Sequence, residues 1–552
     1  MHLRDLSALD AAAGDPRGAL YSASSTNPHR RHDFALGLIA VALLVAGLAV
    51  LAIRWNTPLL GMHSFRQTQT AITSYWIIRG APWLAYPTPV LGAPWSIPFE
   101  FPVYQLLVAG LVKLTGLPLA PAGRMLSYLF VVLTILPAGM LARAYGLGKG
   151  DILVFAILML AAPIYLFWGT AFLMETLVVF FSFAFLAGVE HVALTTSRTV
   201  SLGVVTCGVI GALGKITTFF PFFFLAGSIL LYHLVIRFQH RQPFGYFLVR
   251  AAAVMAPPPI VFWFWNRFAD AEKLQNPIGK LMISTNGRML AWNFGTWGQL
   301  FSREFLMTLF RACTDTLGFY SLIILALLGF VGVYNRVFDR RICIAVAAML
   351  FGFLFPFIVF TNLHIVHNYY DTANAVFLIG ALAAIIGRLF AAEYYRTAWV
   401  CLLFVIASQL LWFRVHFMPN ILHPQGEWQM AIAQTVSSHT EPGSVVIIYG
   451  QNWSSVIPYY AERRALMEPD FVPRGDVIAR LRRALSPVGG YPVEAIVRCP
   501  SPMDRDPEFV RDFSSFDATL AKQHIGPCDV YFAGRKAARN NVAGERNPSA
   551  SR

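Results

Sequence analysis

Long apolar segments recur along the sequence and constrain its fold more than any other feature. The first is residues 34–53, and others follow at short intervals up to residue 413. A helix needs about 20 consecutive apolar residues to cross the hydrocarbon core of a bilayer. Only 13% of the residues are charged, about half the share found in a soluble domain. The sequence therefore excludes a soluble globular protein, a disordered chain and a collagen over most of its length. It predicts a polytopic all-α membrane protein.

Hydropathy divides the chain into a membrane part and a soluble part. We expect about eleven transmembrane helices. They lie at residues 34–53, 125–142, 151–168, 176–194, 200–213, 216–236, 249–265, 314–334, 342–360, 372–390 and 397–413. Residues 1–33 are predicted to form a cytoplasmic N-terminal arm, and residues 34–413 the membrane domain.

The composition changes after Arg414, where the sequence becomes mixed, charged and punctuated by prolines. Residues 414–535 are therefore predicted to form a small α/β domain, with strands at 445–449, 495–497 and 530–533. Residues 536–552 are polar, and we expect a disordered tail there.

The distribution of Arg and Lys predicts how the chain crosses the membrane, and segment 101–118 decides the outcome. This segment is apolar but short, and it contains Gln105 and Lys113, so we expect it to lie in the plane of the interface. The short loops that hold Arg143, Arg237 and Arg388 then all face the cytoplasm, where such residues accumulate. A spanning helix at 101–118 would invert that bias.

This topology places the C-terminal domain outside the cytoplasm, because the number of spans is odd and the N-terminus is cytoplasmic. In that oxidising compartment Cys499 and Cys528 could form a disulfide bond. The basic cytoplasmic loops account for much of the net charge of +14, so no nucleic acid is expected as a partner.

Polar residues that are unusual in a membrane protein collect on the outer side. Ionisable groups at membrane depth are costly and usually face a polar cavity. The candidate site residues are His63, Arg66, Gln69, Glu100, Glu175, Lys215, His364, His367, Tyr369 and Tyr370. Together they predict a site for an anionic substrate that carries hydroxyl groups.

The order of these motifs resembles that of the GT-C membrane glycosyltransferases. The matching stretches, in chain order, are HSFRQTQTA, FEFP, Glu175, Lys215 in GKITTFFP, and HNYYD. The resemblance covers residues 34–413. It is to the family 39-like branch, the dolichyl-phosphate-mannose protein mannosyltransferases and the bacterial aminoarabinose (lipid A) transferases. Those enzymes have an acidic residue early in the first outer loop, where this sequence has His63, Arg66, Gln67 and Gln69.

The resemblance implies a fold and an activity. It implies in-plane helices in the first outer loop and transfer of a sugar from a polyprenyl-phosphate donor, with inversion at the anomeric carbon. The acceptor would be a glycolipid, a polysaccharide or a protein. The reaction would take place at the outer face of the bacterial cytoplasmic (inner) membrane, with the bilayer, the donor and the acceptor as partners.

Three residues are candidates for the general base that such a transfer requires. The apolar neighbours of Glu100 should raise its pKa and suit it to accept a proton near neutrality. Glu175 coincides with an acidic position of the family, although a carboxylate there could also mark the start of a helix. His63 could orient the acceptor, act as the base, or hold a divalent metal ion together with one carboxylate.

Three cations are candidates for binding the donor phosphate. Arg66 and Arg288 offer a bidentate fork, and Lys215 offers a point charge. A lysine near a helix end can also extend to the interface without any such role.

The segment NLHIVHNYYD supplies further candidates for substrate binding. His364 and His367 are three residues apart, which would place them on one helix face. We expect this pair to bind phosphate or hydroxyl groups rather than a metal ion. Tyr369 and Tyr370 could bind a phosphate or stack on a sugar, or they could belong to an interfacial aromatic belt. The sequence names no certain cofactor and leaves a divalent metal ion open.

Two other classes of function stay open at this point. The chain could be a transporter or flippase for lipid-linked sugars, or a non-catalytic membrane protein of envelope assembly. Transporters often contain internal repeats and bind substrates near the membrane midplane. This sequence has no evident repeat, and its polar residues gather at one face, which favours an enzyme.

Overall fold

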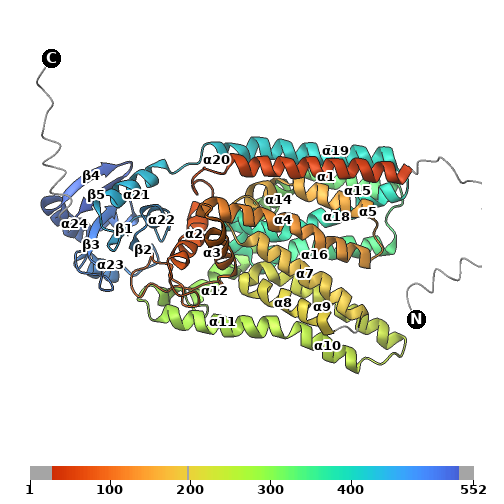
Figure 1. The fold of residues 1–552 in the computed structure, drawn as a ribbon, viewed down its shortest axis with the longest axis horizontal. Coiled ribbons are helices and arrows are strands. Elements are labelled where there is room, and N and C mark those ends of the chain that lie inside the picture. The colour runs from red at the N-terminus through yellow and green to blue at the C-terminus, as the bar shows by residue number, and fades with distance from the viewer. Residues whose placement is uncertain (1–27, 196–197, 534–552) are drawn as a thin grey trace, which may run out of the picture.

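The computed structural model describes residues 28–195 and 198–533, which form a long helical bundle and a sheet domain at one end of it (Figure 1). Most of the predicted N-terminal arm, residues 1–27, lies outside the described residues, as does the predicted tail at 536–552. The helix α1 already begins at Pro28, so the last residues of the predicted arm are helical.

The bundle and its loops contain most of the helices. They are α1 (Pro28–Ile53), α2 (Ser64–Ile78), α3 (Val103–Thr115), α4 (Leu119–Ala144), α5 (Lys149–Ala161), α6 (Pro163–Trp168), α7 (Glu175–Leu194), α8 (Arg198–Gly214), α9 (Ile216–Gln239), α10 (Gly245–Met255), α11 (Pro257–Leu274), η1 (Gly279–Met282), α12 (Gly287–Phe294), α13 (Trp297–Leu300), α14 (Arg303–Leu317), α15 (Ser321–Tyr334), α16 (Arg340–Val359), α17 (Thr361–Val366), η2 (Asn368–Tyr370), α18 (Asp371–Ala391), α19 (Tyr395–Trp412), η3 (Phe413–Phe417) and α20 (Met418–Leu422).

The predicted polytopic helical architecture is confirmed. Among the described residues, 8 helices are long and apolar enough to cross a membrane, and the bent pair α14 and α15 would make a ninth. Two other predicted spans are helical but shorter. Residues 151–168 form α5 and α6, which are separated at Ala162 because Pro163 has no backbone N–H to continue the helix. Residues 200–213 lie in α8, a helix of 17 residues.

Helices α7 and α18 form the centre of the bundle. Both are apolar on nearly all sides, as expected of helices that neighbours surround. In α18 and the residues just before it, 94% of the apolar stretch is buried. Their first residues, Glu175 and Asp371, are both fully buried. The two central helices therefore bring one carboxylate each into the interior of the protein.

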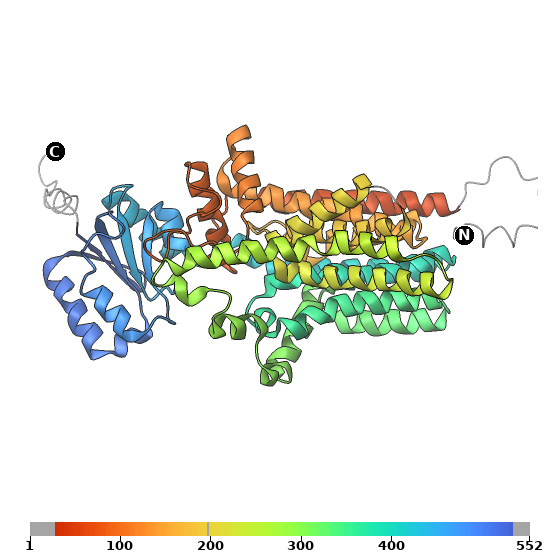
Figure 2. The ribbon, with the colours of Figure 1, turned by 90° about the horizontal axis from the view of Figure 1, so that it is seen from below.

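Segment 101–118 forms the short helix α3 rather than a span. Its 13 residues would extend only about 20 Å at a rise of about 1.5 Å per residue. The helix ends at Thr115 and is followed by Gly116, which has a positive φ of 71° that suits glycine. Figure 2 shows α3 directed across the long axis of the bundle, whereas α4 after it runs along that axis. This direction agrees with the prediction of an in-plane helix.

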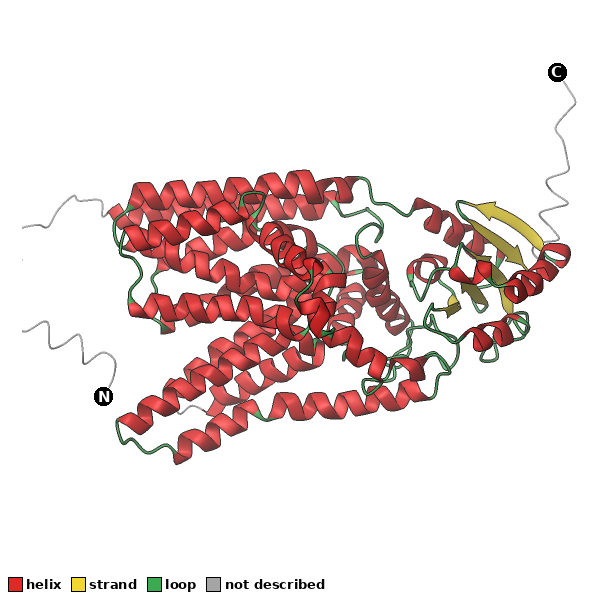
Figure 3. Ribbon diagram, turned by 180° about the vertical axis from the view of Figure 1, so that it is seen from behind, coloured by secondary structure: helices red, strands yellow, loops and turns green. Residues whose placement is uncertain are grey.

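The C-terminal domain is a small α/β domain, as predicted, and Figure 3 shows its sheet beyond the end of the bundle. Its elements are α21 (Glu427–His439), β1 (Val445–Tyr449), α22 (Val456–Ala461), β2 (Arg464–Glu468), α23 (Arg474–Leu481), β3 (Val493–Arg498), η4 (Pro502–Arg505), α24 (Pro507–Thr519), β4 (Ala521–Ile525) and β5 (Cys528–Phe532). The strand order is β2-β1-β3-β5-β4. Strand β1 is parallel to β2 and β3, and β5 is antiparallel to β3 and β4.

The domain contains features that hydropathy did not reveal. Strands β1, β3 and β5 were predicted, whereas β2 and β4 were not. The edge strand β4 exposes most of its side chains, so it has no apolar pattern. Cys499 and Cys528 form the disulfide bond that the topology allowed.

The loop between α2 and α3, residues 79–102, which belongs to the predicted first outer loop, pairs with the edge strand β2 and so connects the two parts of the protein. The Ala465 N–H donates to Pro89 O at 2.8 Å, and the Gly92 N–H donates to Ala465 O at 3.0 Å. The Asn276 side chain, after α11, donates to the carbonyls of Leu91 and Gly92. Ile72 of α2 and the loop residues Val90 and Leu91 share one apolar core with the C-terminal domain. The loop is therefore held from both sides.

Candidate active site

Three helix N-termini converge where the bundle meets the first outer loop. Glu175 is the first residue of α7, Lys215 is the N-cap of α9, and Asp371 is the first residue of α18. A helix N-terminus carries a partial positive charge, which favours nearby carboxylates and anions. This end of the bundle is therefore electrostatically suited to hold negative charge.

Glu175 and Lys215 form an ion pair in the interior, with side chains only 1% and 3% exposed. The Lys215 ammonium also lies over the rings of Tyr370, at 3.9 Å, and Tyr369, at 4.9 Å. A buried charge is strongly unfavourable without such partners, and aromatic faces add a cation–π attraction. Lys215 is therefore fixed within the protein and does not extend to the interface.

A second ion pair joins Arg66 of α2 to Glu100. Arg66 Nη1 also donates to Gln69 Oε1 at 2.7 Å, one turn further along α2. Two hydrogen bonds hold the backbone at Glu100, because the Tyr86 hydroxyl donates to Glu100 O and the Trp265 indole donates to Phe99 O. Glu100 is more accessible than Glu175, with 20% of its side chain exposed.

The electrostatics of Glu100 differ from the sequence prediction. Burial alone raises the pKa of this carboxyl, but the positive charges of Arg66 and Lys215 outweigh burial and lower its pKa below the ordinary value. The expectation that apolar neighbours raise this pKa was therefore wrong. It considered adjacent residues only, whereas the decisive neighbour lies 34 residues earlier in the chain.

His63 lies just before α2 and faces the same group. Its backbone adopts the left-handed conformation, with φ of 48°, which costs a non-glycine residue about 1–3 kcal/mol. Its ring meets those of Tyr369 and His367, with centroids 5.0 and 5.2 Å apart. Burial, aided by the charge of Arg311, lowers the pKa of His63 to about 4. The imidazole is therefore uncharged at neutral pH.

His364 and His367 do not share a helix face. Helix α17 ends at Val366, and His367 has an extended backbone, so the predicted spacing does not hold. His364 Nδ1 pairs with Asp371 Oδ1 at 2.8 Å. The ring of His367 instead stacks on Tyr369, and burial lowers its pKa to about 3. Only His367 of this pair meets His63.

Arg288 is absent from this cluster. It lies at the start of α12, where it donates to Phe471 O of the C-terminal domain and stacks over the Phe471 ring. In its place the structure brings Arg311 of α14, which contacts the carboxylate of Asp371 and the carbonyl of His364. A signal for Arg311 existed in the sequence, because it is a cation beside an apolar segment, on the side that the topology predicts to be outer.

Several buried polar atoms around these residues have no hydrogen-bond partner among the described residues. They are Arg66 Nε, Gln69 Nε2, Trp168 Nε1, Glu175 Oε2 and His367 Nδ1. Buried polar atoms are nearly always paired in native proteins. So many unpaired atoms in one place indicate a site that receives a polar ligand.

The donor set does not fit a metal ion. Within the described parts of the chain, no three His, Cys, Asp or Glu side chains are grouped so that they could hold one. The three carboxylates of the cluster, Glu100, Glu175 and Asp371, are each engaged by a cation.

Similarity to known proteins is found in structure and not in sequence. No protein-family model and no curated protein sequence matches the chain. The aminoarabinose transferase ArnT from Cupriavidus metallidurans, in its structure bound to undecaprenyl phosphate, has a TM-score of 0.58 and 13% identity, covering 90% of this chain and 98% of that one. The apo state of ArnT gives a TM-score of 0.59 at the same identity and coverage. The arabinofuranosyltransferase AftD from Mycobacteria gives 0.50 and 15% identity, covering 93% of this chain and 40% of that one.

These likenesses define the class of fold. The chain is a polytopic membrane protein with the GT-C fold, as the order of its motifs predicted.

The interior ion pair predicts a specific pattern of stability. Glu175→Gln or Lys215→Met should each cost about 3–5 kcal/mol, because each leaves a charge buried without its partner. The double variant should cost less than the two single costs added together. Thermal unfolding of the purified protein in detergent measures this coupling.

The exposed pair Arg474–Glu508 of the C-terminal domain provides the control. Arg474→Met should have a much smaller effect than either variant of the interior pair, because exposed ion pairs contribute little to stability. Additive costs for Glu175→Gln and Lys215→Met would show that the pair is not coupled in the folded protein.

Proposed function

We propose that the chain is a membrane glycosyltransferase. It would transfer a sugar from a polyprenyl-phosphate donor to a hydroxyl group of a glycolipid, polysaccharide or protein acceptor. The main support is that two shielded ion pairs and the uncharged imidazole of His63 lie together at one end of a bundle with the GT-C fold. A structural neighbour, ArnT, has this fold and binds undecaprenyl phosphate.

Arg66 and Lys215 would bind the phosphate of the donor. Negative charge grows on this phosphate as the sugar leaves, and fixed cations stabilise that change most when they are already in place. Glu100 and Glu175 hold the two cations in position before the donor arrives. The N-termini of α7 and α9 add partial positive charge in the same place.

His63 would act as the general base. In a single displacement, the acceptor oxygen attacks the anomeric carbon, and the bond from that carbon to the phosphate oxygen breaks with its electron pair. The proton of the acceptor hydroxyl passes to His63, whose uncharged ring can accept it. Attack opposite the leaving phosphate would invert the anomeric centre.

The polyprenyl tail would reach this site along α14. The apolar side chains of Leu306, Met307 and Phe310 are exposed on this helix, and Arg311 follows them directly at the cluster. An apolar path that ends at a cation suits a lipid phosphate, because the tail and the head group require opposite environments.

The site would face away from the cytoplasm. Arg143, Arg237 and Arg388 lie near the C-terminal ends of α4, α9 and α18, whereas the N-terminal ends of α9 and α18 are at the site. The basic residues therefore lie at the opposite end of the bundle, as the positive-inside rule requires for an outward-facing site.

Loss of the proposed base and cations should abolish transfer. Membranes with the full-length protein are incubated with undecaprenyl-phosphate monosaccharides and candidate acceptors, and the release of undecaprenyl phosphate is measured. His63→Gln should slow the release by about 10²–10⁴-fold. Lys215→Met should slow it by about 10²–10³-fold, because it removes charge from the leaving phosphate.

A matched control is His240→Gln, which changes a histidine at the far end of α9. It should leave the release unchanged. Full activity of both site variants at normal protein levels would contradict the assignment of this site.

The rate of transfer should depend on pH through the protonation of His63. Burial lowers its pKa to about 4, so the base stays uncharged as the pH falls through 6.5, the ordinary value for histidine. The rate should therefore stay level from about pH 8 to about pH 5 and fall only near pH 4. A plot of the wild-type rate against pH should show this fall near pH 4, and the residual rate of His63→Gln should not show it. A fall of the wild-type rate near pH 6.5 would contradict the role of His63.

The orientation can be tested by labelling from outside the cell. A cysteine introduced by Asn452→Cys in the C-terminal domain should react with a membrane-impermeant maleimide, because that domain lies outside the cytoplasm. One introduced by Tyr334→Cys, at the opposite end of the bundle, should react only after the cells are permeabilised. The reverse pattern would place the site on the cytoplasmic side.

A further inference from the structure

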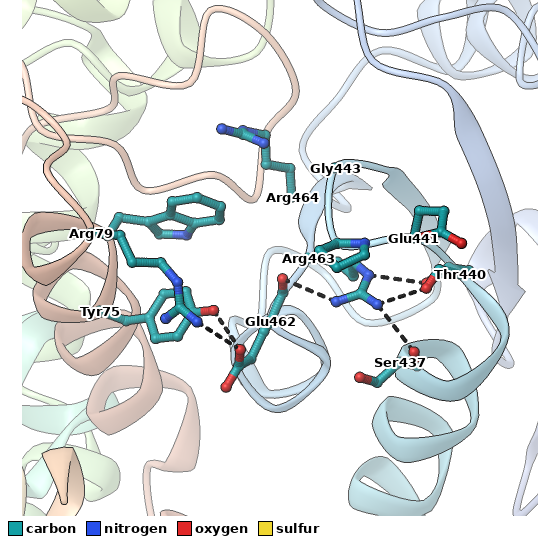
Figure 4. A pocket seen from close by; sticks show the side chains of 11 residues that line it. Tyr75, Arg79, Ser437, Thr440, Glu441, Gly443, Glu462, Arg463 and Arg464 are labelled. Carbon is teal, nitrogen blue, oxygen red and sulfur yellow. Dashed lines mark hydrogen bonds and ion pairs between the residues drawn. The ribbon is translucent and has the colours of Figure 1, made fainter.

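A pocket of about 730 Å³ lies between α2 and the C-terminal domain. The C-terminal half of α2 forms one wall, and the end of α21 with the turn before β2 forms the other. Figure 4 shows Tyr75 and Arg79 on the side of α2, and Ser437, Thr440 and Glu441 on the side of the domain. None of the residues that line it belongs to the ion-pair cluster.

Three arginines line the pocket, and two of them are fully engaged. Arg463 is buried and donates to Thr440 and to the carbonyls of Ser437 and Ala461. Arg79 pairs with the Glu462 carboxylate at 3.2 Å, and the Tyr75 hydroxyl donates to the same carboxylate. Arg79 therefore maintains the contact between α2 and the domain, whereas Arg463 holds together two segments of the domain itself.

Arg464 is different. Its guanidinium has no ion-pair or hydrogen-bond partner in the described part of the chain, and it lies over the rings of Tyr491, at 4.2 Å, and Trp76, at 4.6 Å. In Figure 4 it extends apart from the other two arginines. Stacking on flat rings leaves the edge of the guanidinium free, and that edge is the part that binds carboxylates and phosphates.

Trp76 provides an independent sign of a missing ligand. Its indole Nε1–H is buried and has no acceptor among the described residues. An unpaired donor of this kind is rare in a native protein. Two donors without acceptors thus line the same pocket, one charged and one neutral.

We propose that this pocket binds an anionic group, a carboxylate or a phosphate, carried by the acceptor. The identity of the carrier rests on the proposed function. Trp76 lies about 20 Å along α2 from His63, at a rise of about 1.5 Å per residue. An acceptor that reaches both places is an extended one, such as an acidic glycan or a phosphorylated glycolipid. The anion would hold it while a distant hydroxyl group lies beside His63.

The test measures binding without any donor. The purified full-length protein is titrated with inorganic phosphate, with glucuronate and with neutral glucose, and thermal unfolding is recorded. Phosphate, glucuronate or both should raise the unfolding temperature in a saturable way, and glucose should not. The anion that acts identifies the group that the pocket takes. An equal response to glucose would overturn the proposal.

Variants separate this pocket from the cations near His63. Arg464→Gln should weaken anion binding by about tenfold or more. Trp76→Phe keeps the ring and removes the N–H, so it should weaken binding to a smaller extent and serves if Arg464→Gln does not fold. Arg498→Gln is the control, because Arg498 also stacks on an aromatic ring of this domain but is paired with Asp504. Unchanged binding in both pocket variants would assign Arg464 a structural role only.

The outcomes for the pocket and for the proposed function are distinguishable. His63→Gln should bind the anions like the wild type, because the pocket does not depend on the base. Transfer without anion binding would overturn the pocket and leave the function. Anion binding without transfer from any donor would leave an anion site in a protein with another activity.

Discussion

The ion pair between Lys215 and Glu175 is the constraint on which the site end of the molecule depends. Both charges lie in the interior, so neither is tolerable without the other. Because Glu175 begins α7 and Lys215 precedes α9, the pair fixes the N-termini of two helices against each other. The same ammonium lies over Tyr369 and Tyr370, which precede α18. One lysine thus sets the relative positions of three helix starts.

The second ion pair depends on parts of the chain that lie far apart. Arg66 belongs to α2, and Glu100 follows a loop whose backbone pairs with β2 of the C-terminal domain. Asn276, after α11, binds the carbonyls of that loop from the other side. The C-terminal domain therefore supports the loop that leads to Glu100 of the candidate site. This dependence explains why one apolar core includes residues from α2, from the loop and from the sheet.

The sequence predicted those features that depend on hydropathy and on the distribution of basic residues. It failed for features that depend on contacts between segments far apart in the chain. The apolar segments, the in-plane α3 and the strands β1, β3 and β5 follow from hydropathy alone. His63, Arg66, Glu175, Lys215 and Tyr369 do come together, because topology alone assigns them to one end of the bundle. The predicted direction of the pKa shift of Glu100 was wrong, because the positive charge that lowers this pKa most, Arg66, lies on another element. Strand β4 was missed because an exposed edge has no apolar pattern, and the shared face of His364 and His367 failed because α17 ends between them.

The pairing of the first outer loop with β2 also has a consequence in time. During synthesis the loop is made early, whereas Arg464–Glu468 emerges only after the last apolar helix. Until then the backbone groups of residues 89–92 lack their partners on β2, and the loop is held only from the side of Asn276. A chain that has inserted all its helices but lacks its last domain would therefore carry the charges of the site beside a loop that is held on one side only. Completion of the polypeptide thus completes the support of this loop, which leads directly to Glu100.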